Sequence, residues 1–403
     1  MRSLLFALLV VLVACGSSTS GDDDDVSGGS SDGGGGFPAD HPPLPQVVNT
    51  GGPVMSAPKF IAITFAGDSL ATSIADFSTK IGAGAYWTTV TSEYGVGAGT
   101  STAITIPTAP AASLTDADIQ TFLRSQFGAA LPNPDGNTLY AIYYPTGVTV
   151  TSQGAVGCTA FGGYHSDFSV GSGKFAAYAV MPRCPSQFSG VTVLDTLTAA
   201  ASHEYIEGAT DPFPMDDPAW SNADLSGGGW ARAGGGAEVG DMCAELGDVF
   251  VRSTDVPYLV QRTWSNAAAA ASKDPCVPDG ISPYFGAAPV LPDTASILVA
   301  SPTPQAVSLV KIPVGQSQTI ELDLFSDADT LGTYNITATD LASAATGSDP
   351  ELTFSLDNAS GRNGDKIHLT ITSVKKDPTG LSAFYIQSSI GFNDTFWVAL
   401  VQN

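Results

Sequence analysis

Two stretches divide this chain into parts that must fold separately: one has too few apolar side chains to contribute to a core, and the other is interrupted by prolines. Residues 16–45 are mostly Gly, Ser, Asp and Pro. Such a segment cannot bury enough apolar surface to offset the entropy of ordering, so we expect a disordered tether. Residues 281–295, which prolines interrupt repeatedly, predict an interdomain linker. The remaining sequence is long enough for two cores, over residues 46–280 and 296–403.

The first 15 residues have the features of an export signal. Arg2 precedes an apolar run over residues 4–13 that is too short to span a bilayer. The run ends in Leu-Val-Ala before Cys15, which resembles the lipobox of bacterial lipoproteins, where the cysteine is acylated and becomes the new N-terminus. An ordinary signal peptide with an incidental cysteine is the alternative. We expect a membrane-anchored lipoprotein, and Gly16 resembles the sorting pattern for the outer membrane or cell surface.

The cysteines and the charge fit an exported protein. Four cysteines remain besides Cys15, an even number that favours two disulfides. We prefer the pairs Cys158–Cys184 and Cys243–Cys276 because each closes a local loop. The sequence has no Cys-x-x-Cys spacing, so a cysteine zinc site is not favoured. A formal net charge of −24 predicts that the chain does not bind nucleic acid.

The two domains differ in their hydrophobic patterns. Residues 296–403 alternate apolar and polar side chains with a period of two, which predicts half-buried strands and an all-β immunoglobulin-like sandwich. The clearest strands cover residues 306–310, 319–324, 352–356 and 366–371. In the first domain, apolar runs predict buried strands over residues 60–65, 138–144 and 174–182, with a helix from about residue 114 to 127. Strands interspersed with helices predict an α/β or α+β domain there.

A second predicted helix, within residues 193–212, carries a candidate metal-binding motif. His203 and Glu207 are four positions apart, so their side chains lie on one face, one turn apart. This is the geometry of the zinc-protease helix H-E-x-x-H, in which the glutamate beside the first histidine, here Glu204, is the general base. Glu207 replaces the second histidine, and a carboxylate can bind zinc but also suits calcium or manganese.

Three residues outside the motif complete the candidate site. Glu238 follows a Gly-rich run that can fold back over the helix, so we expect it to be the third metal ligand, with Asp241 supporting it. Asp211, just past the helix, is the competing ligand or a second supporting residue. His165 could polarise a substrate oxygen, although a locally hydrogen-bonded turn residue is an equal alternative. Spacing alone also leaves open an acidic surface helix that binds nothing.

A series of short motifs follows the same order as in a known family. They are Gly51-Gly52-Pro53-Val54, Tyr86-Trp87, Glu93-Tyr94-Gly95, Cys158 with Gly162-Gly163-Tyr164-His165, the His203-Glu204-x-x-Glu207 helix leading to Thr210-Asp211-Pro212, the segment from Glu238 to Cys243, and the run holding Val260, Gln261, Trp264, Ser265 and Asn266. The series resembles the plant phosphate-induced (Exordium) protein family and its bacterial relatives over most of residues 46–280. The resemblance implies an exported or wall-associated protein with an α+β zincin-like domain, but no established reaction.

These observations predict a surface-anchored, zinc-dependent hydrolase, in particular a peptidase, acting on a peptide or cell-wall substrate. His203, Glu207 and Glu238 would hold zinc, with calcium as the alternative ion, and Glu204 would accept the proton of the attacking water. The alternative is a non-catalytic cell-surface or cell-wall-binding lipoprotein whose acidic site is structural or empty. An open metal position would favour the enzyme, and a site closed by protein oxygens would favour the structural ion.

Overall fold

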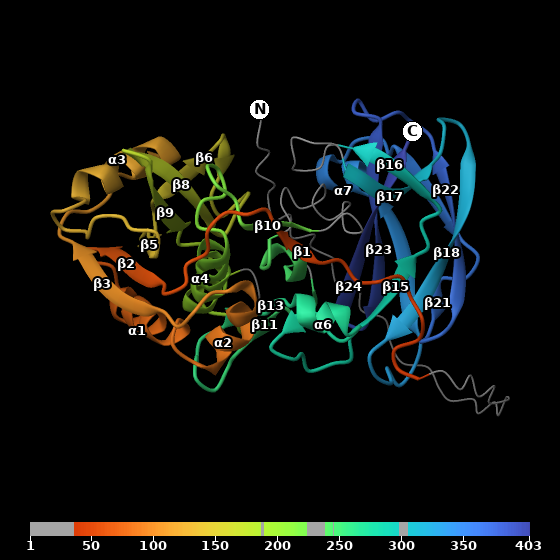
Figure 1. The fold of residues 1–403 in the computed structure, drawn as a ribbon, viewed down its shortest axis with the longest axis horizontal. Coiled ribbons are helices and arrows are strands. Elements are labelled where there is room, and N and C mark those ends of the chain that lie inside the picture. Colours follow the sequence, from red (N-terminus) through yellow and green to blue (C-terminus); the bar gives the residue numbers. More distant parts are fainter. Residues whose placement is uncertain (1–35, 187–188, 224–237, 245, 298–304) are drawn as a thin grey trace.

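The computed structural model describes residues 36–186, 189–223, 238–244, 246–297 and 305–403. The expected signal peptide, lipidated Cys15 and most of the expected tether lie outside the described residues. The described chain is mostly β-sheet with few helices, and it forms two lobes (Figure 1). None of the described helices is long and apolar enough to cross a membrane.

The first lobe is built on a five-stranded sheet in the order β3-β2-β5-β9-β8. Its strands are β2 (Lys59–Phe65), β3 (Thr100–Ile106), β5 (Thr138–Tyr143), β8 (Tyr164–Gly171) and β9 (Lys174–Met181). The pairs β2–β3, β2–β5 and β5–β9 are parallel, and β8 adds an antiparallel edge. Strands β2, β5 and β9 are almost continuously buried, as expected for parallel strands covered on both faces. The three strands predicted in this domain are confirmed.

Helices cover both faces of this sheet. Apolar side chains of α1 (Ala71–Ile81) and α4 (Val193–Thr210) pack on one face, and those of α3 (Asp116–Gln126) pack on the other. The predicted helix over residues 114–127 begins slightly later because Thr115 forms a capping box with Asp118. The predicted helix within 193–212 continues past Gly208 to Thr210, since its neighbours are buried and stabilise the last turn.

Short elements connect and surround this framework. They are β1 (Val47–Asn49), α2 (Ala85–Thr91), η1 (Ser92–Tyr94), β4 (Ser113–Thr115), β6 (Thr149–Ser152), β7 (Ala155–Val156), β10 (Trp220–Ala223), η3 (Asp241–Cys243), β11 (Phe250–Val251), β12 (Val260–Gln261), β13 (Thr263–Trp264), α6 (Asn266–Ala270) and β14 (Cys276–Val277).

The second lobe is a sandwich of two packed sheets, as the period-two pattern predicted. One sheet has the order β15-β18-β22-β20 and the other β16-β17-β24-β23-β19-β21, and their apolar faces share one core (Figure 1). The elements are β15 (Phe285–Pro289), β16 (Asp293–Ile297), β17 (Gln305–Lys311), β18 (Ser317–Ser326), β19 (Tyr334–Asp340), α7 (Leu341–Thr346), β20 (Leu352–Leu356), β21 (Ser360–Gly361), β22 (Lys366–Ser373), β23 (Leu381–Ile390) and β24 (Asn393–Gln402).

The segment expected to be a linker, residues 281–295, is part of this sandwich. It contains β15, which pairs with β18 along its whole length, and the start of β16. Both are edge strands of their sheets. Proline is tolerated at sheet edges because its missing N–H need not pair there, so the prolines that suggested a linker are compatible with strands.

The end of the expected tether is also ordered against the second lobe. The backbone N–H of Ala39 donates to Asn363 Oδ1 at 2.8 Å, and the His41 ring stacks on Phe325 with 3.9 Å between centroids. The two lobes contact each other directly, since the backbone N–H of Gly247 donates to the Asp394 carbonyl at 3.1 Å. Residues 36–45 and the lobe contact therefore hold the first domain to the sandwich.

Candidate metal centre

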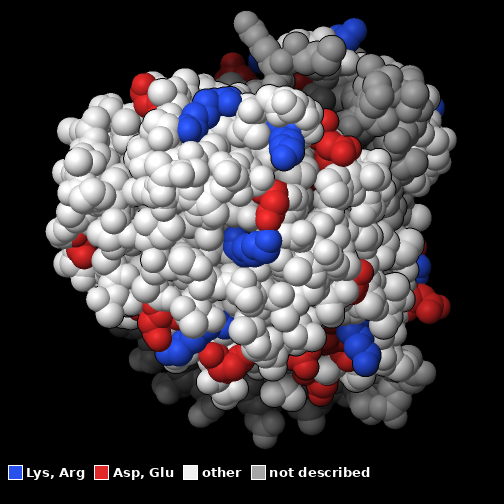
Figure 2. All heavy atoms as spheres, turned by 60° about the vertical axis from the view of Figure 1, so that its left-hand side comes forward, with Lys and Arg blue, Asp and Glu red and all other residues white. Residues whose placement is uncertain are grey.

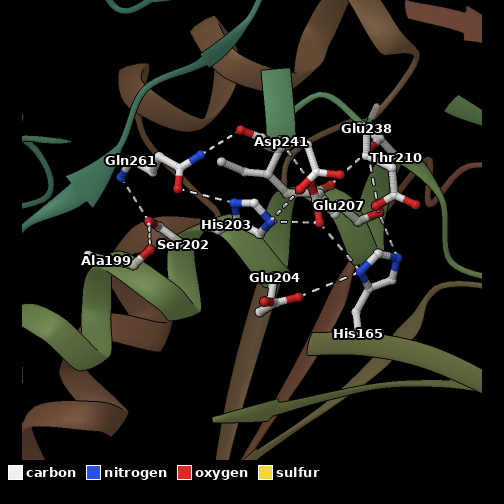
Figure 3. A network of polar contacts seen from close by, with 12 residues as sticks. His165, Ala199, Ser202, His203, Glu204, Glu207, Thr210, Glu238, Asp241 and Gln261 are labelled. Carbon is white, nitrogen blue, oxygen red and sulfur yellow. Dashed lines mark hydrogen bonds and ion pairs between the residues drawn. The ribbon is translucent and has the colours of Figure 1, made fainter. Parts of the chain in front are cut away.

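The edge strand β8 supplies the first side chain of the site. Successive residues of a strand point to opposite faces of the sheet. Tyr164 faces α3, where its hydroxyl donates to Asp116 Oδ1 at 2.7 Å, and His165 faces α4 (Figure 3). The histidine that sequence analysis left as a possible turn residue therefore lies in a strand beside the predicted metal helix.

Helix α4 presents the His-Glu-x-x-Glu motif to this strand. The helix is fixed at its start by a capping box between Thr192 and Asp195, and Glu204 and Glu207 are both buried. His203 Nε2 lies 2.9 Å from Glu207 Oε2, as expected for side chains one turn apart.

His165 lies among three carboxylates. Its Nδ1 is 3.6 Å from Glu204 Oε2 and 3.6 Å from Glu207 Oε2, and its Nε2 is 3.6 Å from Glu238 Oε2. The imidazole is 7% exposed, and its Nε2 has no hydrogen-bond partner among the described residues. A buried ring nitrogen without a partner is costly, which makes it a candidate to receive a ligand.

The Glu238 segment closes over the helix as predicted. The backbone N–H of Asp241 donates to Glu207 Oε1 at 3.1 Å, and Asp241 Oδ1 lies 3.7 Å from His203 Nε2. The segment is held in place by the backbone N–H of Trp264, which donates to the Val239 carbonyl at 2.8 Å.

Both predicted disulfides are present and flank the site. The bridge Cys158–Cys184 joins the residues that precede β8 to those that follow β9, so it fastens the hairpin that carries His165. The bridge Cys243–Cys276 ties η3 to β14, directly after Asp241. Two of the three segments that form the site are therefore covalently anchored.

Gln261 fixes the orientation of His203, a role that sequence analysis missed. Its Nε2 donates to the Gly240 carbonyl at 2.7 Å, so its Oε1 faces His203 Nδ1 at 3.1 Å. The carbonyl of Gly240 can only accept, which orients the amide and places the imidazole hydrogen on Nδ1. The Nε2 of a neutral His203 then directs a lone pair at Glu207, and a cation or a proton must lie between the two acceptors.

Two glycines allow the backbone to approach the site, and sequence analysis gave neither a role. A Cβ on Gly240 would lie 2.7 Å from Glu207 Oε1 and 2.8 Å from His203 Nδ1. A Cβ on Gly163 would lie 2.8 Å from Glu204 Oε1. Both glycines belong to motifs of the family resemblance, which was the available signal, but only the packing identifies their function.

The two imidazoles are held in a strongly negative environment. Burial lowers the pKa of His165, but the contact with Glu204 and the charge of Glu207 outweigh it and raise the pKa to about 9. Burial likewise opposes protonation of His203, yet the adjacent Glu207 raises its pKa well above the usual value.

The surrounding carboxyls show the same excess of negative charge. Burial and the charge of Glu207 raise the pKa of Glu238 well above its usual value and that of Asp241 to about 7. Burial also raises the pKa of Asp211. Among the described residues, the ion pairs of Glu204, Glu207, Glu238 and Asp241 come from His165 and His203. Four carboxylates thus share two imidazoles, an arrangement that a divalent cation would stabilise.

The spacing of the donor atoms fits zinc. Zinc ligands lie about 2.0–2.2 Å from the ion, so neighbouring ligands in a tetrahedral site are roughly 3.3–3.6 Å apart. The separations of 2.9 and 3.6 Å around Glu207 are close to that range. Two sets of donors each lie within 4.8 Å of one another, namely His165, Glu207 and Glu238, and His203, Glu204 and Glu207.

The structure thus brings together every residue predicted for the site, and it favours one of the two roles predicted for Asp211. Asp211 caps the C-terminus of α4, where its Oδ1 accepts a hydrogen bond from the Ala219 backbone at 2.7 Å. Its Oδ2 is buried without a hydrogen-bond partner among the described residues. Asp211 is therefore placed by the helix end, as a supporting residue would be.

The outer face of the first lobe shows little charge by comparison. On the face drawn in Figure 2, Lys and Arg side chains lie apart from one another, with Asp and Glu scattered between them.

Comparison with known proteins identifies no family. No protein-family model and no curated protein matches the chain. Among solved structures, it is similar to domains 4–9 of the surface layer protein SbsC, with 19% identity, a TM-score of 0.18 and coverage of 28% of this chain and 14% of that one. It is also similar to SbsC domains 4 and 5, with 16% identity, a TM-score of 0.18 and coverage of 38% of this chain and 65% of that one. Its similarity to the titin M3 domain has 12% identity, a TM-score of 0.16 and coverage of 23% of this chain and 85% of that one. Likenesses at these TM-scores carry no argument about function.

Proposed function

We propose that this chain is an exported, zinc-dependent hydrolase, most simply a peptidase, anchored to a membrane through a lipid on Cys15. The observation that carries the proposal is the position of the buried Glu207 carboxylate between His203 and His165, with Glu238 beside His165. The resemblance to the Exordium family and the expectation of a zincin-like domain support the same conclusion. Two disulfides fit a protein that folds outside the cytoplasm.

The chain's own residues have separate roles in this proposal. His203, Glu207 and Glu238 would hold the ion, which would supply polarisation of a substrate carbonyl and a more acidic water. Glu204 accepts the proton of the attacking water, because its carboxylate lies on the same helix face as the ligands and is 6% exposed. His165 can donate a hydrogen bond to the substrate oxygen.

The surroundings of the site favour a reactive centre over a closed structural one. A structural calcium site uses six to eight oxygen ligands. Here two imidazoles lie among the carboxylates, and imidazole favours zinc over calcium. The Asp241 side chain is 34% exposed and that of His203 is 16% exposed, so the side of the site near α4 and η3 is its most accessible part.

The test combines metal analysis with turnover on the full-length protein purified in detergent. We expect stoichiometric zinc, lost in Glu207→Ala and retained in Glu204→Gln, and cleavage of a peptide library that Glu204→Gln abolishes. Glu321→Ala, an exposed sandwich glutamate paired with Lys366, is the matched control and should change neither. Calcium or no metal in the wild type, or full activity in Glu204→Gln, would refute the proposal. Either result would favour the non-catalytic surface-binding alternative.

A further inference from the structure

We infer that the site holds two divalent cations bridged by the carboxylate of Glu207. The inference rests on the proposed function, but it adds a second ion and makes His165 and Asp241 metal ligands. One position would be held by His165, Glu207 and Glu238, and the other by His203, Glu207 and Asp241.

The first argument is how the donors divide. His165 and Glu238 form one close set with Glu207, and His203 and Glu204 form another with the same Glu207. The ligands of one zinc ion cannot be more than roughly 4.4 Å apart, because each is about 2.2 Å or less from it. Glu207 is the residue that the two sets share, and a bridging carboxylate is how a protein holds two ions about 3.5–4 Å apart.

The second argument is the position of Glu207 between the imidazoles. Its Oε2 lies 3.6 Å from His165 Nδ1 and 2.9 Å from His203 Nε2. In Figure 3 the two rings lie on opposite sides of this carboxylate. Its other oxygen, Oε1, accepts from the Asp241 backbone at 3.1 Å, which fixes the plane of the carboxylate.

The third argument concerns the unpartnered His165 Nε2. This nitrogen is 3.6 Å from Glu238 Oε2, whereas His203 Nε2 is directed at Glu207 by the bond to Gln261. His165 Nε2 therefore faces Glu238, whereas His203 Nε2 faces Glu207 and Asp241. Asp241 completes the second set because its Oδ1 lies 3.7 Å from His203 Nε2.

The fourth argument is charge. The carboxyl groups of Glu204, Glu207, Glu238 and Asp241 all lie within 3.7 Å of one of the two imidazoles, and two divalent cations would compensate more of their charge than one. Glu204 also lies in the close set of His203 and Glu207, but it keeps its role as base because Asp241 supplies the third ligand of that position.

The experiment counts ions in the full-length protein. After removal of metal with a chelator and dialysis, zinc is added back and measured by elemental analysis and calorimetric titration. We expect two equivalents in the wild type, one in His165→Ala, one in Asp241→Ala and none in Glu207→Ala. His368→Ala, in the sandwich and exposed beside Asp357, is the control and should keep two. Circular dichroism verifies that each variant is folded.

A second readout is independent of variants. Loading with Mn²⁺ should give an exchange-coupled electron paramagnetic resonance spectrum, because a bridging carboxylate couples two neighbouring ions. One equivalent in the wild type, lost equally in His165→Ala and His203→Ala, would overturn the inference and leave the proposed hydrolase intact. No bound metal in the wild type would overturn both.

Discussion

Replacing Gln261 by Met tests whether the site depends on a fixed orientation of His203. Met has a similar length and no hydrogen-bonding amide, so it removes two bonds, to His203 Nδ1 at 3.1 Å and to the Gly240 carbonyl at 2.7 Å. Gln261 is 5% exposed, and water cannot readily replace either bond.

The expected cost has two parts. Leaving a buried partner unsatisfied costs about 1–3 kcal/mol per group, so Gln261→Met, which leaves two groups unsatisfied, should lower the free energy of unfolding by roughly 2–6 kcal/mol. Removing the group that orients a histidine ligand typically lowers metal affinity about 10–100-fold. That loss corresponds to about 1.4–2.7 kcal/mol of binding free energy.

The assay measures urea unfolding of the metal-free protein and zinc affinity by competition with a chelator. Gln120→Met is the matched control, because Gln120 donates to Asp116 at 2.9 Å and to the Tyr178 hydroxyl at 3.2 Å on the opposite face of the sheet. The control should lose some stability and keep its zinc affinity. If Gln261→Met binds zinc within twofold of the wild type despite the loss of stability, the argument that Gln261 sets the ligand geometry is refuted.

Three further predictions concern the packing, the helix and the covalent anchors. Gly240→Ala should weaken zinc binding at least tenfold, because the new Cβ would lie 2.7 Å from Glu207 Oε1. Gly136→Ala is the control and should not weaken zinc binding, because no atom lies within 4 Å of the position of its Cβ. Competition with a chelator measures the zinc affinity of both variants. Burial raises the pKa of the Asp195 carboxyl, but hydrogen bonds from Thr192 and Arg252 outweigh burial and lower the pKa below its usual value. The stabilisation that the ionised carboxylate gives is present above pH ~4 and is lost as the pH falls through the lowered pKa. Asp195→Asn should therefore destabilise the protein by about 1 kcal/mol at pH 7 and by progressively less as the pH falls below ~4, measured by urea unfolding. Replacing Cys243 and Cys276 together by Ser should lower the free energy of unfolding by about 3–4 kcal/mol, given their separation of 33 residues, and an unchanged unfolding curve would contradict this.

Much of the fold was accessible from local patterns. Three local patterns in the sequence correspond to elements of the fold. Continuous apolar runs form the buried strands β2, β5 and β9, a capping signal begins helix α3, and alternating apolar residues form strands of the sandwich. The segment 281–295 was wrong as a linker because proline marks edge strands as well as loops, and only the pairing of β15 with β18 distinguishes them.

The site was predictable only where its residues share one element. Spacing on a helix dictates that His203 and Glu207 meet, so this pair needs no tertiary information. His165 joins them because β8 pairs antiparallel at the sheet edge and turns this side chain toward α4, which no local pattern encodes. The role of Gln261 could not be predicted from the sequence, because it depends on the contacts of the glutamine amide with His203 and Gly240 in the folded protein.

The assembly of the site from three separate segments explains where the disulfides lie. Helix α4 is positioned by its own capping box and by burial of its apolar side chains against the sheet. The β8–β9 hairpin and the Glu238–Asp241 segment carry titratable side chains whose burial is unfavourable, and the charge of Glu207 also opposes ionisation of Glu238. A disulfide at each of these two segments limits how far it can move, and thereby keeps the histidine and acidic side chains close together. Because disulfides form outside the cytoplasm, the proposed export of the chain would bring it to the compartment in which both bridges can close.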